Sequence, residues 1–119
     1  MNARDLGRLR AVLPSDFILH DRRRTGLGRI EGAEAFLRSL AALFEASRES
    51  RVETLYTLEV QPHGELAMVR TVGTLASGGE FESKYLRIIT RAWSLELFEP
   101  EELTSARARF EELRASRTD

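Results

Sequence analysis

The sequence predicts a single α+β domain built on an antiparallel sheet. Apolar residues recur at helical spacing over residues 31–46, and from residue 52 onward they alternate with polar residues, as in half-buried strands. Short turns connect the alternating segments, so consecutive strands are expected to form hairpins, with the helices gathered on one face of the sheet. A length of 119 residues fits one domain with one core, spanning residues 1–119.

The N-terminal residues predict a short helix followed by a strand. Asn2 and Asp5 have the spacing of a capping box at the start of a helix, and Pro14 ends it. A short apolar strand is predicted over residues 17–20 and a polar, glycine-bearing loop over residues 21–28. One helix and one strand therefore precede the longest helix of the chain.

The longest predicted helix spans residues 31–46 and leads into a series of strands. Its apolar face consists of Phe36, Leu37, Leu40, Leu43 and Phe44. The predicted strands span residues 52–60, 66–75, 81–90 and 93–98. Pro100 opens a last helix, because proline suits a first helical position. The predicted buried face of that helix consists of Leu103, Ala106, Phe110 and Leu113.

The composition excludes several classes of protein and site. A formal charge of −1 gives no basic surface for nucleic acid, and the absence of cysteine excludes disulfides, thiolate metal sites and cysteine nucleophiles. No apolar run approaches the roughly 18 residues of a membrane span, and the polar N-terminus is no secretory signal, so we expect a cytoplasmic protein. His20 and His63 lack metal-ligand spacing and are expected to be solvated, so we expect neither metal nor cofactor.

Three stretches, residues 2–17, 19–36 and 94–103, resemble the NTF2-like superfamily, especially its SnoaL-like (ketosteroid isomerase-like) domains. The resemblance implies a cone-shaped, cystatin-like fold in which a curved antiparallel sheet wraps around a long helix. It also implies a further helix before Asn2, so this N-terminally shortened chain is expected to form a cone that is open or covered by a partner. Residues 91–93 leave room for only a short last hairpin. This fold hosts many functions and does not by itself predict a reaction.

Asp21 is the sharpest candidate for a catalytic residue. Alternation places Phe17, Leu19 and Asp21 on one face of the first strand, and a carboxylate in an apolar cone would have a raised pKa. In the ketosteroid isomerases, which the chain resembles, an aspartate at the end of this strand is the proton-shuttling base. The alternative is a loop carboxylate that pairs with an arginine of residues 22–24, a basic loop otherwise expected to be solvated.

Two tyrosines could complete such a site. The isomerases need donors to an oxyanion, and Tyr56 or Tyr85 could donate a hydrogen bond, although such residues more often pack in a core. No aspartate lies between Asp21 and Asp119 to supply the second acid that the resemblance implies. The isomerase set is therefore incomplete.

Arg70 and Glu96 are charges in the middle of predicted strands. Arg70 is expected to pair with Glu82 or Glu96 inside the cone, which is similar to the Asp-Arg-Asp set of epoxide hydrolases with this fold. Such a pair could be catalytic, could hold an acidic ligand or could only set structure. A structural or dimer-interface role is favoured, since buried charges are usually paired.

Two functions follow from these patterns. The favoured one is a non-catalytic module that binds a small hydrophobic ligand or mediates dimerisation. The alternative is an isomerase, cyclase or hydrolase that acts on a small hydrophobic substrate with Asp21 as general base. Apolar side chains on both faces of the last strand, among them Trp93, Leu95 and Leu97, predict a homodimer through the sheet, and Leu75 of an earlier strand is expected to add to the covered surface. The candidate ligand-binding residues are Phe17, Leu19, Tyr56, Arg70, Tyr85 and Glu96.

Overall fold

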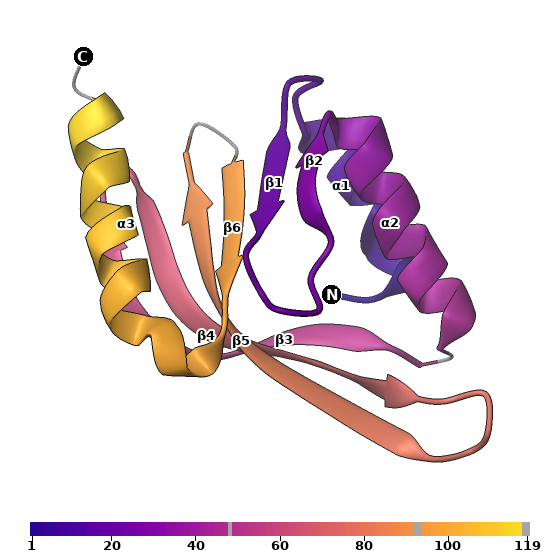
Figure 1. Ribbon diagram of the computed structural model, residues 1–119. Coiled ribbons are helices and arrows are strands. Elements are labelled where there is room, and N and C mark those ends of the chain that lie inside the picture. The colour runs from indigo at the N-terminus through magenta and orange to yellow at the C-terminus, as the bar shows by residue number, and fades with distance from the viewer. Residues whose placement is uncertain (48, 92–93, 118–119) are drawn as a thin grey trace.

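The computed structural model describes residues 1–47, 49–91 and 94–117, and it contains helices on either side of a curved sheet (Figure 1). In chain order the elements are η1 (Ala3–Asp5), α1 (Leu6–Val12), β1 (Ile18–Asp21), β2 (Gly28–Glu31), α2 (Ala33–Ala46), β3 (Arg51–Gln61), β4 (Gly64–Thr74), β5 (Glu80–Thr90), β6 (Ser94–Phe98), η2 (Pro100–Glu102) and α3 (Leu103–Arg117). The predicted α+β class is confirmed. Trp93, which was expected to help cover a dimer interface, lies outside the described residues.

The sheet has six strands in the order β2-β1-β6-β5-β4-β3. The long strands β3, β4 and β5 follow one another through hairpins and pair antiparallel, as predicted. Strand β1 pairs with β6 in parallel, with Leu19 opposite Leu95 and Asp21 opposite Leu97. The prediction of a purely antiparallel sheet was therefore wrong at this one junction, where segments more than seventy residues apart in the chain meet.

Apolar residues occupy both faces of β4 and β5, and each face is covered by helices. On the inner face, toward α1 and α2, the core includes Ala67, Val69 and Tyr85. On the outer face, toward α3, it includes Leu66, Leu86 and Ile88. The prediction that the helices gather on one face was wrong, because alternating strands that are apolar on both sides need cover on both sides.

The N-terminal capping box is present. The side chain of Asn2 accepts a hydrogen bond from the backbone N–H of Arg4 at 2.9 Å, and Asp5 accepts one from the N–H of Asn2 at 2.8 Å.

Helix α2 begins at Ala33 rather than at residue 31, since Glu31 belongs to β2. Strand β2 was not predicted, since the expected loop ended at Gly28 and the expected helix began at Glu31, and it pairs with β1 at one edge of the sheet.

Strand β3 forms the opposite edge and departs from strict alternation. Its register against β4 shifts between Thr54 and Tyr56 and again between Thr57 and Glu59. Each shift moves the following side chains to the other face of the sheet. Tyr56 is consequently 54% exposed, so the predicted half-buried alternation through this strand was wrong.

Helix α3 packs as its sequence predicts. Ala106 and Phe110 are fully buried, and Leu103 and Leu113 pack against the same cluster. His63, at the β3–β4 turn, is buried as well. Its Nε2–H donates a hydrogen bond of 2.8 Å to the carbonyl oxygen of Phe110, and the centroids of the two rings lie 4.2 Å apart. The prediction that His63 is solvated was therefore wrong.

Candidate ligand-binding site

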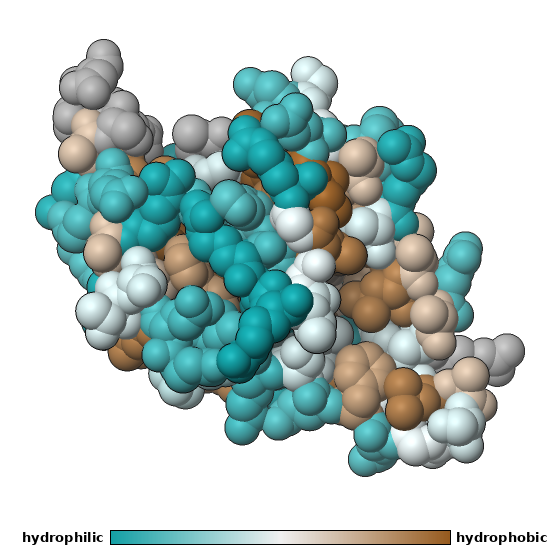
Figure 2. All heavy atoms as spheres, viewed as in Figure 1, coloured by the Kyte–Doolittle hydropathy of each residue, from teal (hydrophilic) through white to brown (hydrophobic). Residues whose placement is uncertain are grey.

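A cavity of about 590 Å³ lies between the inner face of the sheet and helices α1 and α2. Most of its lining is apolar, and Figure 2 shows hydrophobic surface gathered in the same region, between α2 and the hairpin end of β4 and β5. The apolar lining residues are Met1, Leu9, Leu13, Phe17, Leu19, Leu27, Phe36, Leu40, Ala42, Leu43, Val52, Phe81, Ile89, Leu95 and Leu97. The polar lining residues are Arg23, Thr25, Ser39, Thr71, Ser83, Tyr85, Arg87, Thr90 and Ser94.

Asp21 anchors the loop that closes one side of this cavity. Its side chain is 0% exposed, and its two carboxylate oxygens each accept a hydrogen bond of 2.8 Å from the Arg23 guanidinium. The backbone N–H groups of Arg23 and Leu27 donate to the same carboxylate at 3.2 and 3.0 Å. Gly26 passes so close that a Cβ at this position would stand 2.4 Å from Oδ1 of Asp21. The loop is thus built around a satisfied carboxylate.

The pKa of Asp21 is lowered, not raised as expected for a base in an apolar cone. Burial alone would raise the pKa, but the hydrogen bonds from Arg23 and from the backbone N–H of Leu27 outweigh it and hold the carboxyl below its ordinary range. Arg23, rather than Asp21, lines the cavity, and its guanidinium lies 4.3 Å from the centroid of the Tyr85 ring. The arrangement is therefore a buried ion pair whose cation faces the cavity.

Arg87 brings a second cation to the same wall. It lies two residues after Tyr85 in β5, so both side chains emerge on the inner face. The hydroxyl of Tyr85 forms a hydrogen bond of 2.9 Å with Thr71. Neither Arg87 nor Thr71 was singled out from the sequence, although their alternation with buried neighbours is visible there.

Three of the six predicted ligand-binding residues line the cavity, namely Phe17, Leu19 and Tyr85. Tyr56 is exposed on the edge strand and does not line it. Glu96 is buried on the outer face, where it accepts hydrogen bonds from Arg22 at 2.6 Å and from Arg109 of α3 at 2.9 Å. Its predicted place in the cone was wrong, because Leu95 and Leu97 on either side of it face the cavity.

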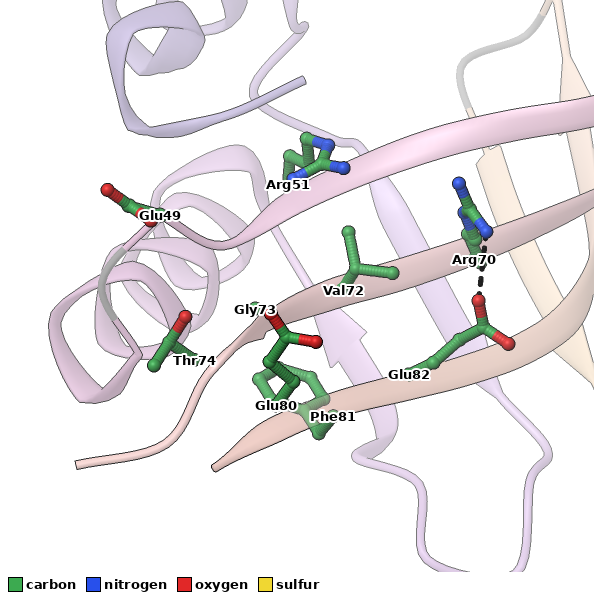
Figure 3. A pocket seen from close by; sticks show the side chains of 9 residues that line it. All are labelled: Glu49, Arg51, Arg70, Val72, Gly73, Thr74, Glu80, Phe81 and Glu82. Atoms are coloured by element: carbon green, nitrogen blue, oxygen red, sulfur yellow. Dashed lines mark hydrogen bonds and ion pairs between the residues drawn. The ribbon is translucent and has the colours of Figure 1, made fainter. Parts of the chain in front are cut away.

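Arg70 lies in a second, polar hollow of about 410 Å³ on the other side of the sheet from the cavity (Figure 3). Its guanidinium contacts Glu53 at 2.7 Å and Glu82 at 2.9 Å, so the predicted pairing with Glu82 is present but outside the cone. These side chains are about one-third or more exposed, and such pairs contribute little to stability. The prediction of an Arg70–Glu96 pair was wrong.

Acidic side chains and histidines are absent from the described lining of the cavity. Within residues 1–47, 49–91 and 94–117, no group of three or more His, Cys, Asp or Glu side chains could hold a metal ion. In the same part of the chain, no helix has the length and apolar character needed to cross a membrane. The chemistry of the cavity is therefore that of apolar groups, hydroxyls and two guanidinium groups.

No protein-family model matches the sequence, and no curated protein matches it. Similar solved structures do exist. A protein of Catenulispora acidiphila DSM 44928 with a ketosteroid isomerase-like fold, in complex with trimethylamine, is 13% identical, with 82% of this chain and 76% of that one covered and a TM-score of 0.65. TerC co-crystallised with polyporic acid is 17% identical, with 92% and 85% covered and a TM-score of 0.63.

An NTF2-like protein of unknown function from Burkholderia pseudomallei K96243 is also 17% identical, with 81% of this chain and 79% of that one covered and a TM-score of 0.62. At such low identity these likenesses concern the fold alone. The chain has the NTF2-like fold, and the resemblance drawn from its sequence is confirmed at that level.

Proposed function

We propose that this domain is a non-catalytic module that binds a small, mainly apolar ligand in the cavity between α1–α2 and the inner face of the sheet. The observation that carries the proposal is the cavity itself, because its volume of about 590 Å³ and its apolar lining are typical of small-molecule sites. One protein of the same fold is in complex with trimethylamine and another was co-crystallised with polyporic acid, which supports the proposal of a small-molecule site.

The lining of the cavity favours binding over proton-transfer chemistry. A general base needs a pKa near the working pH and an oxygen or nitrogen within reach of the substrate. Asp21 has a lowered pKa, and all four of its hydrogen bonds hold it within its own loop. The alternative, an isomerase, cyclase or hydrolase with Asp21 as general base, therefore has less support.

The neutral fluorescent probe N-phenyl-1-naphthylamine is expected to bind the wild-type domain, and a cavity-filling substitution is expected to remove that binding. Ser83 lines the cavity and is itself exposed, so the indole of Ser83→Trp would occupy space that the probe needs. We expect its affinity to fall by about tenfold or more in a fluorescence titration.

The neighbouring substitution Lys84→Trp is the matched control, because alternation points this side chain to the outer face opposite Arg70. It should leave the probe affinity within about twofold of wild type. Absence of probe binding by a folded wild-type domain, or equal binding by both tryptophan variants, would rule out the cavity as the binding site.

Dimerisation through the sheet forms the second part of the proposal. Tyr56 and Val60, on the edge strand β3, are 54% and 65% exposed, which leaves apolar surface for a second copy. Light scattering across a concentration series is expected to report a dimer, and Tyr56→Glu with Val60→Glu is expected to give a monomer. A monomeric wild type at every concentration would contradict this part without affecting the ligand site.

A further inference from the structure

The charged lining of the cavity is unbalanced. Two arginines contribute to it, Arg23 and Arg87, and the described lining holds no acid. Asp21, which lies behind the lining, neutralises Arg23 through a two-point ion pair. Arg87 has no comparable two-point partner: its ion pair with Glu65 is 3.6 Å long and Glu65 does not line the cavity, so the positive charge at this wall is only partly compensated.

The contacts of Arg87 show how incomplete its compensation is. Its Nε is buried without a hydrogen-bond partner among the described residues. Its Nη2 donates a hydrogen bond of 3.3 Å to the hydroxyl of Thr54 and forms an ion pair of 3.6 Å with Oε1 of Glu65, a separation too long for a hydrogen bond. Burial lowers the pKa of Arg87, and Glu65 opposes that shift. An arginine nevertheless stays cationic at neutral pH, so a largely buried guanidinium is balanced only by a long ion pair with a carboxylate that is itself 35% exposed.

The position of Arg87 places that charge inside an apolar site. The side chain starts on β5, opposite Ala67 of β4 and Leu97 of β6, and crosses β4 to reach Thr54 on β3. Leu97 and Tyr85, its neighbours on the inner face, both line the cavity. A molecule that fills the cavity would meet hydrophobic side chains over most of its surface and a guanidinium at the sheet.

We propose that the ligand of this cavity is an apolar molecule that bears one anionic group, and that Arg87 binds the anion. This inference rests on the proposed function and names the class of ligand. A carboxylate suits the site because a planar guanidinium can donate two parallel hydrogen bonds to it. Aliphatic and aromatic acids share this chemistry, and the experiment separates them.

Displacement of bound N-phenyl-1-naphthylamine tests the proposal with matched competitors. Dodecanoate is compared with dodecan-1-ol, and 2-naphthoate with 2-acetylnaphthalene, so that each pair differs mainly in the charged group. For at least one pair, the acid is expected to displace the probe from wild type at a concentration about tenfold lower than its neutral partner does. The pair that shows the preference identifies an aliphatic or an aromatic ligand.

Arg87→Met should reduce that preference to about one, because methionine keeps the apolar bulk and removes the donors. Arg70→Met is the control, since Arg70 lies outside the cavity, and it should keep the wild-type ratio. Should Arg87→Met fail to fold, a 15N-labelled wild-type sample decides: the side-chain Nε–H resonance of Arg87 should move with the acid and not with its neutral partner.

The outcomes separate the two proposals. No binding of the neutral probe contradicts the proposed function. Probe binding with equal displacement by acids and neutral partners overturns the anionic ligand and leaves the proposed function standing. A preference for acids that persists in Arg87→Met, or an Arg87 resonance that does not respond to the acid, overturns the assignment of the anion to this residue.

Discussion

Asp21→Asn is expected to lower the free energy of unfolding by about 3 to 5 kcal/mol at pH 7, because it breaks a buried ion pair and leaves one partner uncompensated. The Asp21 side chain is fully buried and the Arg23 side chain is 21% exposed, so solvent screens the pair little. An asparagine preserves the shape but offers one acceptor oxygen in place of two charged ones. Urea unfolding followed by circular dichroism measures the difference.

The same pair gives a defined dependence on pH. Asp21 has a lowered pKa in the folded domain, so its contribution is complete above the unfolded pKa of about 3.9 and is lost as pH falls through the folded value. The stability difference between wild type and Asp21→Asn should therefore stay constant from pH 7 to about 5 and shrink below about pH 4. A difference that grows toward low pH would contradict this assignment.

Glu34→Gln provides the matched control for Asp21→Asn. Glu34 pairs with Arg10, but both side chains are about 60% exposed, and such surface pairs contribute about 0 to 1 kcal/mol. A loss of similar size in both variants would show that burial of the Asp21 pair has no special role. A loss confined to Asp21→Asn identifies the carboxylate as the centre of the loop between β1 and β2.

Local chemistry made much of the fold predictable from the sequence. The capping box at Asn2 and the apolar face of α3 depend on residues a few positions apart, and both are present as predicted. Strand β2 was missed because it is short and mostly exposed, with only Ile30 packed against the core. The parallel contact of β1 with β6 joins distant segments, and no local pattern encodes it.

The candidate site was predictable only in part, for the same reason. Alternation correctly grouped Phe17, Leu19 and Asp21 on one buried face. The partner of Asp21 was left open because it depends on a loop backbone in which Gly26 lets the chain pass against the carboxylate. The charge at Arg87 was overlooked because the sequence alone does not show which strand face encloses a cavity.

Phe110→Ala is expected to cost about 3 to 5 kcal/mol of stability, which is the usual loss for a large aromatic side chain removed from a core. Phe110 is fully buried in the outer cluster and stacks against His63. Phe110→Leu retains much of the volume and should cost less, about 1.5 kcal/mol or below. Thermal and urea unfolding of both variants measure the two losses.

The ligand site should survive this substitution. The outer cluster and the cavity occupy opposite faces of the sheet and share no side chain in the described residues. Below its unfolding transition, Phe110→Ala should therefore bind N-phenyl-1-naphthylamine within about twofold of wild type, since distant sites act independently. Loss of probe binding by the folded variant would instead show that α3 sets the curvature of the sheet, and with it the width of the cavity.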